Sequence, residues 1–197
     1  MIAGLLLASG ASRRFGSNKL LTPLDGRAIV RWSAEALVSA VDATYVAVPT
    51  RSHEVRTALD GLDVRWVENP DAESGMASSI RAGVASLPAN AEAVVITLGD
   101  QPLIDASLIR HVVARWRETS GATRAVTTAY ADGRGHPTLF GAAVFPALRT
   151  LAGDRGAREL LDQLGDGVMV VEVDGPRPLD VDTPEALRAI ARQIAAR

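Results

Sequence analysis

The sequence predicts an α/β fold, a Rossmann-like three-layer sandwich in which helices cover both faces of a mostly parallel sheet. Short apolar runs bounded by turn residues alternate along the chain with segments of helical periodicity, as in strands joined by crossover helices. The chain has 197 residues, of which 47% are hydrophobic and 22% are charged. It can therefore bury a sizeable core within a single domain spanning residues 1–197.

Six apolar runs are the expected strands. The first run superficially resembles a signal peptide, but no basic residue precedes it and it is only a few residues long, so we expect a buried strand. No run approaches the roughly 18 apolar residues of a membrane span, so we expect a cytoplasmic protein that does not bind membranes. The six expected strands are residues 2–8, 43–49, 63–68, 92–99, 124–131 and 167–173.

Five segments between or after these strands have helical periodicity. In one of them, Leu108, Val112 and Trp116 fall on a single face, which we expect to be buried. The last segment begins with Thr183 and Pro184, residue types that are common at helix starts. The five expected helices are residues 28–40, 75–87, 107–118, 156–164 and 183–196.

Composition excludes several function classes. A net charge of −2 argues against a protein that coats nucleic acid. The absence of cysteine excludes disulfides, thiolate nucleophiles and cysteine-type zinc sites. His53, His111 and His136 have no metal-ligand spacing, and no G-x-S-x-G motif indicates a serine hydrolase.

The loop after the first strand combines small residues with basic ones. Gly10 and Gly16 let backbone N–H groups approach an anion closely, and Arg13, Arg14 and Lys19 supply positive charge. The spacing matches neither the Walker A motif nor G-x-G-x-x-G. The alternative is a solvated basic turn. Lys19 favours a phosphate site, because the only lysine of an arginine-rich chain places a compact ammonium in this loop.

Two acidic segments follow later strands. Asp100 comes directly after an apolar run, at the expected carboxyl edge of the sheet, where it could hold Mg²⁺ against phosphate oxygens. The alternative is a Gly-Asp turn ended by Pro102. Asp180 and Asp182 point to the same side if their segment is extended, although Asp182 could instead cap the last helix.

A third group of residues indicates an anionic ligand. Gly135, His136 and Pro137 are expected to form a turn before a short strand, with His136 either facing a ligand or simply hydrogen-bonded and partly buried. Arg155 and Arg158 fall at a helix start, where a basic side chain opposes the helix dipole. Their position therefore suggests a nearby anion.

Taken together, these motifs resemble those of the nucleotidyltransferases that act on sugar phosphates, isoprenoid precursors and molybdopterin. LLLASGASRRFGSNKLL is followed in order by GMASSIRAG, GDQP, GHP, GDRGAR and DVDTPE, over residues 2–187. The series is most similar to the molybdenum cofactor cytidylyltransferases and related molybdopterin nucleotidyltransferases. This resemblance implies transfer of CMP from CTP to the terminal phosphate of molybdopterin, Mg²⁺ as cofactor, and a recipient molybdenum hydroxylase as a further partner.

The resemblance also assigns roles to individual residues. Those it places around the base and ribose are Ala8, Ser9, Gly10, Ser78 and Ser79. Those it places on the triphosphate are Arg14 and Lys19, and those that would hold Mg²⁺ are Asp100 and Asp182. These last four form the expected catalytic set. The residues it directs toward the pterin phosphate are His136, Arg155 and Arg158.

One position leaves the base open. Cytidylyl members have Leu-Ala-Ala-Gly and guanylyl members Leu-Ala-Gly-Gly, whereas this chain has Ser9 between Ala8 and Gly10. CTP is favoured by the GDQP and GHP motifs, with GTP as the alternative. The acceptor could instead be another phosphorylated metabolite, such as a sugar 1-phosphate or methylerythritol phosphate. The protein could also be a non-catalytic carrier of the molybdopterin dinucleotide.

Overall fold

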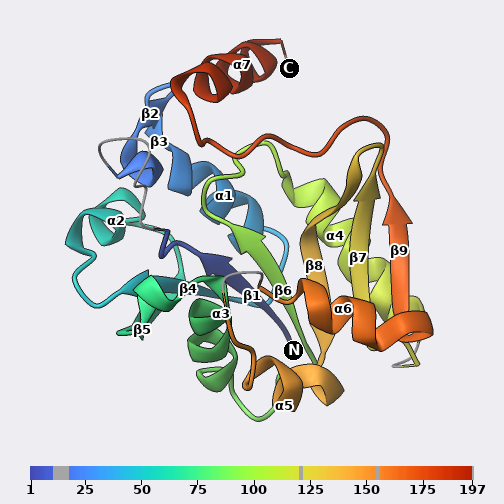
Figure 1. Ribbon diagram of the computed structural model, residues 1–197. Helices are drawn as coiled ribbons and strands as arrows, with labels where there is room; N and C mark the ends of the chain where they lie inside the picture. The colour runs from blue at the N-terminus through green and yellow to red at the C-terminus, as the bar shows by residue number, and fades with distance from the viewer. Residues whose placement is uncertain (11–17, 120–121, 154–155, 197) are drawn as a thin grey trace.

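A seven-stranded sheet forms the centre of the computed structural model, which describes residues 1–10, 18–119, 122–153 and 156–196 (Figure 1). The strand order is β5-β4-β1-β6-β8-β7-β9. The six expected strands are all present, and a seventh, β8, contains the short strand expected after Pro137 but begins earlier, at Gly133. The strands are β1 (Ile2–Leu7), β4 (Ala43–Pro49), β5 (Val64–Asn69), β6 (Ala93–Leu98), β7 (Ala125–Tyr130), β8 (Gly133–Gly141) and β9 (Val168–Glu172). A separate hairpin pairs β2 (Pro23–Leu24) with β3 (Arg27–Ala28).

The sheet is mixed but mostly parallel, as predicted. Strands β5, β4, β1 and β6 run parallel, and β9 runs parallel to β7. Strand β8 is antiparallel to both β6 and β7. The carboxyl ends of β1 and β6 therefore meet at one edge, where ligands of open parallel sheets bind.

The predicted turn at Gly135, His136 and Pro137 is wrong, because these residues lie inside β8. The hairpin pairing jumps from Thr127↔Thr138 to Thr128↔Gly135, so His136 and Pro137 form the extra residues of an irregularity in the strand. Their peptide bond is cis. Glycine and proline here mark a bulge rather than the end of a strand.

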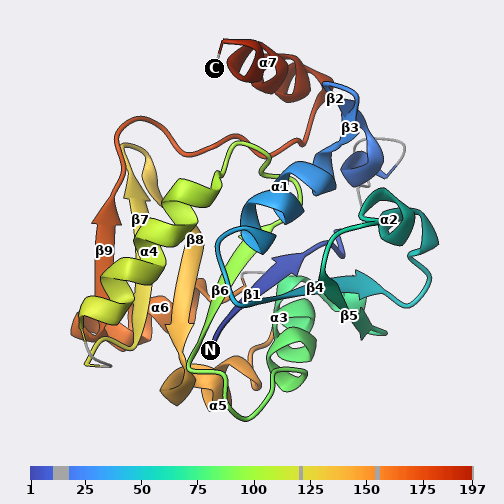
Figure 2. The ribbon, with the colours of Figure 1, turned by 180° about the vertical axis from the view of Figure 1, so that it is seen from behind.

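Helices cover both faces of the sheet, which confirms the predicted layers (Figures 1 and 2). One core cluster lies between the sheet and α1, α2 and α4, and a second lies between the sheet and α3, α5 and α6. Helix α7 packs on a smaller cluster with Leu24, Leu103 and Val181. The helices are α1 (Ile29–Val38), α2 (His53–Ala58), α3 (Met76–Ala85), α4 (Ala106–Glu118), α5 (Phe145–Leu148), α6 (Arg158–Leu164) and α7 (Pro184–Ala195). Short 3₁₀ helices are η1 (Lys19–Leu21), η2 (Ala72–Ser74), η3 (Ala142–Val144) and η4 (Gly165–Gly167).

The buried face of α4 differs from the expected one. Val112 is buried as predicted, but Ile109 and Val113 complete the buried face, while Leu108 and Trp116 are only partly buried. The buried face of α4 is therefore rotated by about one residue around the helix relative to the predicted face. No helix in the described ranges is long and apolar enough to cross a membrane.

Two glycines let helices approach the central strand β1 closely. A Cβ built on Gly83 of α3 would lie 2.4 Å from both Cδ atoms of Leu5, and one built on Gly4 would lie 2.7 Å from Cγ of Leu37. Gly4 and Leu5 point to opposite faces of the sheet because side chains alternate along a strand. Helices α3 and α1 thus clamp β1 from both sides, just before the loop that carries the predicted phosphate-binding residues.

Gly83→Ala tests this clamp. Alanine is normally the better helix former by about 1 kcal/mol. Here the added methyl group would overpack a core that has no room for it, at a cost of about 1–3 kcal/mol. We therefore expect a lower free energy of unfolding in urea denaturation. Adding Leu5→Val should recover part of the loss, and a single variant as stable as the unchanged protein would contradict the close packing.

Candidate functional site

An ion-pair cluster joins three distant segments at the carboxyl edge of the sheet. Lys19 begins η1 after the first loop, Asp100 follows β6, and Asp182 lies in the segment that crosses the top of the sheet between β9 and α7 (Figure 1). We call this segment, residues 173–183, the strap. The ammonium Nζ of Lys19 lies 2.6 Å from Oδ2 of Asp100 and 2.6 Å from Oδ1 of Asp182. Three of the four residues in the predicted catalytic set therefore meet at one point.

Local structure explains how the strap brings Asp182 there. The N–H of Val181, which is fully buried, donates to the carbonyl oxygen of Asp100 at 3.0 Å. Thr183 is the N-cap of α7, and its Oγ1 accepts a hydrogen bond from the N–H of Ala186 at 3.2 Å. The alternative in which Asp182 caps the helix is therefore wrong, and its carboxylate pairs with Lys19 instead.

The cluster has a strong excess of negative charge. Burial alone would lower the pKa of Lys19, but the Asp100 and Asp182 carboxylates outweigh it and raise that pKa above its usual value. Burial, together with the charge of Asp100, raises the pKa of the neighbouring Asp180 carboxyl. Lys19 is thus held as an ammonium ion among three carboxyl groups.

The two carboxylates that hold Lys19 fit a divalent cation. Both reach a single positive centre, and oxygen ligands of this kind are those that Mg²⁺ prefers. Within the described ranges no group of three or more histidine, cysteine, aspartate or glutamate side chains could hold a metal. Asp100 and Asp182 would therefore hold the ion as a pair, with the other ligands coming from substrate phosphates and water.

The start of the first loop is anchored to β4. The N–H of Ala8 donates to the carbonyl oxygen of Ala47 at 2.9 Å, and Oγ of Ser9 donates to the same oxygen at 3.1 Å. Gly10 is exposed, and a Cβ there would meet nothing within 4 Å. The role of these three residues at the base and ribose stays a prediction. Arg14 lies outside the described residues.

Ser78 and Ser79 are buried in α3. Their hydroxyl oxygens accept hydrogen bonds from Nδ2 of Asn69 at 2.8 and 3.0 Å, and Ser78 donates to the carbonyl oxygen of Gly75 at 2.8 Å. These contacts tie the end of β5 to the start of α3. The placement of the two serines beside the base and ribose stays a prediction.

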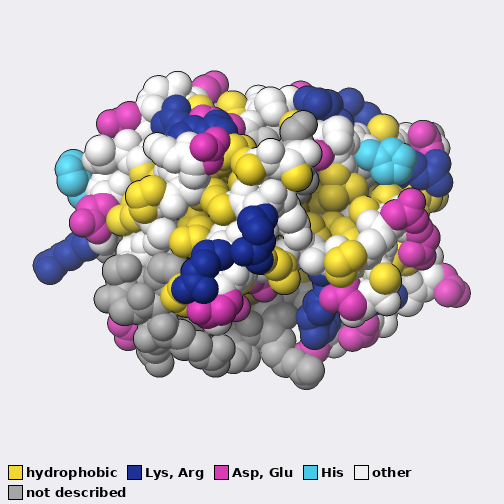
Figure 3. Space-filling model, turned by 90° about the horizontal axis from the view of Figure 1, so that it is seen from above, with side chains coloured by type: hydrophobic (Ala, Val, Ile, Leu, Met, Phe, Trp, Pro, Cys, Tyr) yellow, Lys and Arg dark blue, Asp and Glu magenta, His cyan; other side chains and the backbone are white. Residues whose placement is uncertain are grey.

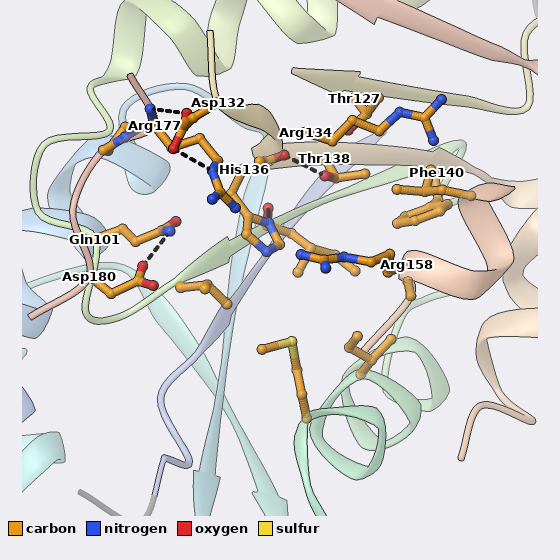
Figure 4. A pocket seen from close by; sticks show the side chains of 18 of the residues that line it. Gln101, Thr127, Asp132, Arg134, His136, Thr138, Phe140, Arg158, Arg177 and Asp180 are labelled. Atoms are coloured by element: carbon orange, nitrogen blue, oxygen red, sulfur yellow. Dashed lines mark hydrogen bonds and ion pairs between the residues drawn. The ribbon is translucent and has the colours of Figure 1, made fainter. Parts of the chain in front are cut away.

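A cavity of about 380 Å³ opens beside the carboxylates (Figure 4). Its floor is apolar, and guanidinium, amide, hydroxyl and imidazole groups surround it. Seen from above, the surface over the strand ends has apolar side chains in its hollows and charged side chains around them (Figure 3). The apolar lining residues include Met76, Ile80, Ile96, Leu98, Phe140 and Leu161. The polar lining residues include Gln101, Thr127, Asp132, Arg134, His136, Thr138, Arg158, Arg177 and Asp180.

His136 stands in the wall of this cavity. Its Nδ1 lies 3.2 Å from the carbonyl oxygen of Ile96, which can only accept, so Nδ1 carries the proton. Burial lowers the pKa of His136 and favours the neutral ring, which leaves a lone pair on Nε2. The hydroxyl of Tyr130 donates to the His136 carbonyl at 2.7 Å and fixes the backbone. His136 thus fits both expectations from the sequence, because it is hydrogen-bonded and also lines a site.

Sequence reasoning missed part of the cavity. Arg158 lines the cavity and begins α6, and its role on the acceptor side stays a prediction, whereas Arg155 lies outside the described residues. Gln101, Arg134 and Arg177 were not singled out. Gln101 could have been found, because it directly follows Asp100 in GDQP and so shares its place at the strand end.

Lys19→Met tests the cation position. Methionine keeps much of the side-chain length but removes the ammonium that occupies the carboxylate pair. We expect the variant, without nucleotide, to bind Mn²⁺ about tenfold more tightly than the unchanged protein does. This corresponds to about 1.4 kcal/mol, because the ammonium no longer competes with the metal for the two carboxylates. Electron paramagnetic resonance of unbound Mn²⁺ measures this. Adding Asp182→Asn should abolish the gain, and unchanged affinity in the single variant would show that the carboxylates do not share one cation position.

Comparisons with known proteins identify the family of this chain. Residues 4–169 match the MobA-like NTP transferase domain. The chain is 33% identical over 207 residues to the purine catabolism protein PucB of Bacillus subtilis, covering 98% of each. It is 32% identical over 127 residues to a probable molybdenum cofactor guanylyltransferase of Haloferax mediterranei, covering 64% of this chain and 60% of that protein.

Solved structures extend the similarity to the whole fold. Rv0371c of Mycobacterium tuberculosis H37Rv has a TM-score of 0.82 and 34% identity, with 97% of each chain covered. Its complex with manganese has a TM-score of 0.78 and 32% identity, covering 97% of this chain and 98% of that one. The chain therefore belongs to the MobA-like NTP transferase family, and it is an NTP-dependent nucleotidyltransferase.

Proposed function

We propose that the protein transfers CMP from CTP to the terminal phosphate of molybdopterin, giving the dinucleotide cofactor and pyrophosphate. The observation that carries this proposal is the adjacency of two features. The cluster of Lys19, Asp100 and Asp182 suits a triphosphate and its metal. Gln101, which directly follows Asp100 in the chain, lines a cavity that suits a ring-shaped acceptor with a phosphate.

The cavity has the character that this acceptor requires. An apolar floor can contact a planar ring system, and the guanidinium groups of Arg134, Arg158 and Arg177 can meet a phosphate. His136 stands between these surfaces (Figure 4). Arg155, if it belongs to the same group as the resemblance implies, would add a further positive charge.

The chemistry follows from charge. A phosphate oxygen of the acceptor attacks the α-phosphorus of CTP, the bond to the β-phosphate oxygen breaks, and pyrophosphate leaves with the electron pair. Both partners are anionic, so catalysis requires positioning and positive charge rather than a covalent intermediate. The acceptor phosphate is already ionised at neutral pH and requires no general base.

Each residue of the cluster would have its own role in this reaction. Asp100 and Asp182 would hold a divalent ion, which we propose is Mg²⁺ and which supplies Lewis-acid stabilisation to the phosphates when bound. The manganese complex of Rv0371c supports a divalent metal in this family. Lys19, together with Arg14, would neutralise charge on the departing pyrophosphate.

Two relatives bear on the substrate. The Haloferax relative is named as a probable molybdenum cofactor guanylyltransferase, so guanylyl transfer is the second candidate function. PucB acts in purine catabolism, which is compatible with a product delivered to a molybdenum hydroxylase. We propose such an enzyme as the recipient of the dinucleotide.

Pyrophosphate release tests the function directly. With molybdopterin and Mg²⁺ present, we expect release from CTP to be at least roughly tenfold faster than from GTP, equivalent to about 1.4 kcal/mol of discrimination, and no release without molybdopterin. Faster release from GTP would establish the guanylyl alternative. Release from neither nucleotide, in a protein that binds CTP, would favour the carrier function or another acceptor.

Asp100→Asn tests the metal-holding carboxylate. Loss of one such electrostatic contact typically lowers the rate by about 10²–10³, or about 2.7–4 kcal/mol of barrier. We expect this loss in turnover at limiting Mg²⁺, with an unchanged circular dichroism spectrum because Asp100 is a partly exposed residue at a strand end. Asp63→Asn, an exposed change at the opposite edge of the sheet, is the matched control. Near-normal turnover of Asp100→Asn would exclude the metal role.

A further inference from the structure

One buried hydrogen-bond acceptor in the cavity has no partner among the described residues. Gln101 is 7% exposed, and its Nε2 donates to Oδ1 of Asp180 at 2.6 Å. Its Oε1 is buried and accepts no hydrogen bond from any residue that the structure describes. An unpaired buried acceptor is costly, so native proteins seldom keep one without a reason. Its amide end points into the cavity (Figure 4), and a ligand donor would therefore complete it.

Asp180 fixes which end of the amide faces the ligand. When ionised, the Asp180 carboxylate can only accept hydrogen bonds, and the hydrogen bond from Gln101 acts against the raised pKa of Asp180 by favouring this ionised form. The amide of Gln101 accordingly turns its NH₂ group toward Asp180. Rotation that exchanged the two ends would place two oxygens against each other. Oε1 is thereby held as the acceptor that remains for a ligand.

Other groups near Gln101 also offer hydrogen-bond acceptors to a ligand in the cavity. Nε2 of His136 is a second acceptor, because Nδ1 carries the ring proton. Asp180 has a second carboxylate oxygen beyond the one that Gln101 contacts. Arg158 lies across His136 from Gln101 and Asp180, whereas Arg177 lies on their side and pairs with Asp132 (Figure 4). The cavity thus offers acceptors beside Gln101 and a guanidinium without this carboxylate partner across from them.

We propose that Gln101 is a specificity-determining residue for the acceptor substrate, with Oε1 accepting a hydrogen bond from an N–H group at the edge of a planar heterocycle. Asp180 is the positioning residue that holds the amide in this orientation. The ligand class is a flat ring with an exocyclic amino group, whose N–H is the donor to Oε1, and a phosphate on its other end. The inference rests on the proposed function, because it concerns the acceptor cavity of that reaction.

Two simple probes isolate the N–H edge: pterin, and lumazine, which has an oxo group in place of the 2-amino group. Their dissociation constants are measured by their own fluorescence, with CTP present. We expect the unchanged protein to bind pterin about tenfold more tightly than lumazine, since lumazine keeps the ring N–H groups but presents an oxo group, an acceptor, where the amino donor to Oε1 would lie. Gln101→Met, close in shape but without the amide, should lower pterin affinity about tenfold and bring the ratio near one.

Matched variants separate a direct effect of Gln101 on ligand recognition from a general effect of the substitution on the structure. Gln163→Met makes the same exchange at an exposed position of α6 and should change nothing. Gln101→Glu alone sets two carboxyl groups against each other and should weaken pterin binding. Gln101→Glu combined with Asp180→Asn restores a hydrogen bond between the pair and keeps an oxygen toward the cavity. This double variant should regain the preference for pterin.

The outcomes distinguish this inference from the proposed function. Equal pterin affinity in Gln101→Met and the unchanged protein would overturn the role of Gln101, as would the absence of any preference for pterin over lumazine. If pyrophosphate release from CTP with molybdopterin persists in that case, the proposed function stands without it. A Gln101→Met variant with unaltered CTP and Mn²⁺ binding, but a raised KM for molybdopterin, would support both.

Discussion

The ion pair of Lys19 with Asp100 and Asp182 is the interaction on which the rest of the site depends. It joins the end of the β1 loop, the end of β6 and the strap, which are separated by up to 163 residues in the chain. Asp100 and Lys19 are both largely shielded from water, with 19% and 12% of their side chains exposed. Screening is therefore weaker than at the surface, and removal of the cation would leave carboxylates facing each other. The groups that we propose bind phosphate and metal are thus kept assembled because they neutralise one another.

The strap also connects the ion-pair cluster to the proposed acceptor cavity. Arg177 is fixed by Asp132, whose carboxylate accepts from the Arg177 backbone N–H at 2.8 Å and from Nε at 3.1 Å. The pKa of Asp132 is lowered by these hydrogen bonds, first of all the one from the backbone. Asp180 then meets Gln101, and Asp182 meets Lys19. Because residues 177–182 contribute both to the proposed acceptor cavity and to the ion-pair cluster, the proposed function implies that the positions of the two substrates are geometrically linked.

The sequence predicted most of the fold and grouped Lys19, Asp100 and Asp182, which the structure brings together, but it did not predict the contacts of the cavity beside them. Alternation of apolar runs and helical segments identified six of the seven main strands, since burial on both faces makes parallel strands read as continuous apolar runs. The sequence predicted a turn in place of the first part of β8, because Gly135 and Pro137 interrupt the strand at a bulge. Helices α2 and α5 were missed because they are too short for periodicity to reveal. Asp100 and Asp182 could be placed because they follow predictable elements. Gln101 could have been placed beside Asp100 from GDQP, but Arg134 and Arg177 could not be placed in the cavity, because only tertiary packing brings the strap against β6 and β8.

The identity of the single lysine follows from the same geometry. One nitrogen of Lys19 lies 2.6 Å from oxygens of two different carboxylates, an arrangement that needs a compact charge with several donors. A guanidinium would spread its charge over a planar fork and favour a bidentate contact with one carboxylate. The flexible stem matters as well, because a triphosphate and its metal would compete for both partners at once. A metal on Asp100 and Asp182 would displace the ammonium, and the phosphates would offer that ammonium a new anionic partner a short distance away. Lysine can make this exchange by rotating its stem, whereas the arginines used elsewhere in the chain would be held by geometry as well as by charge.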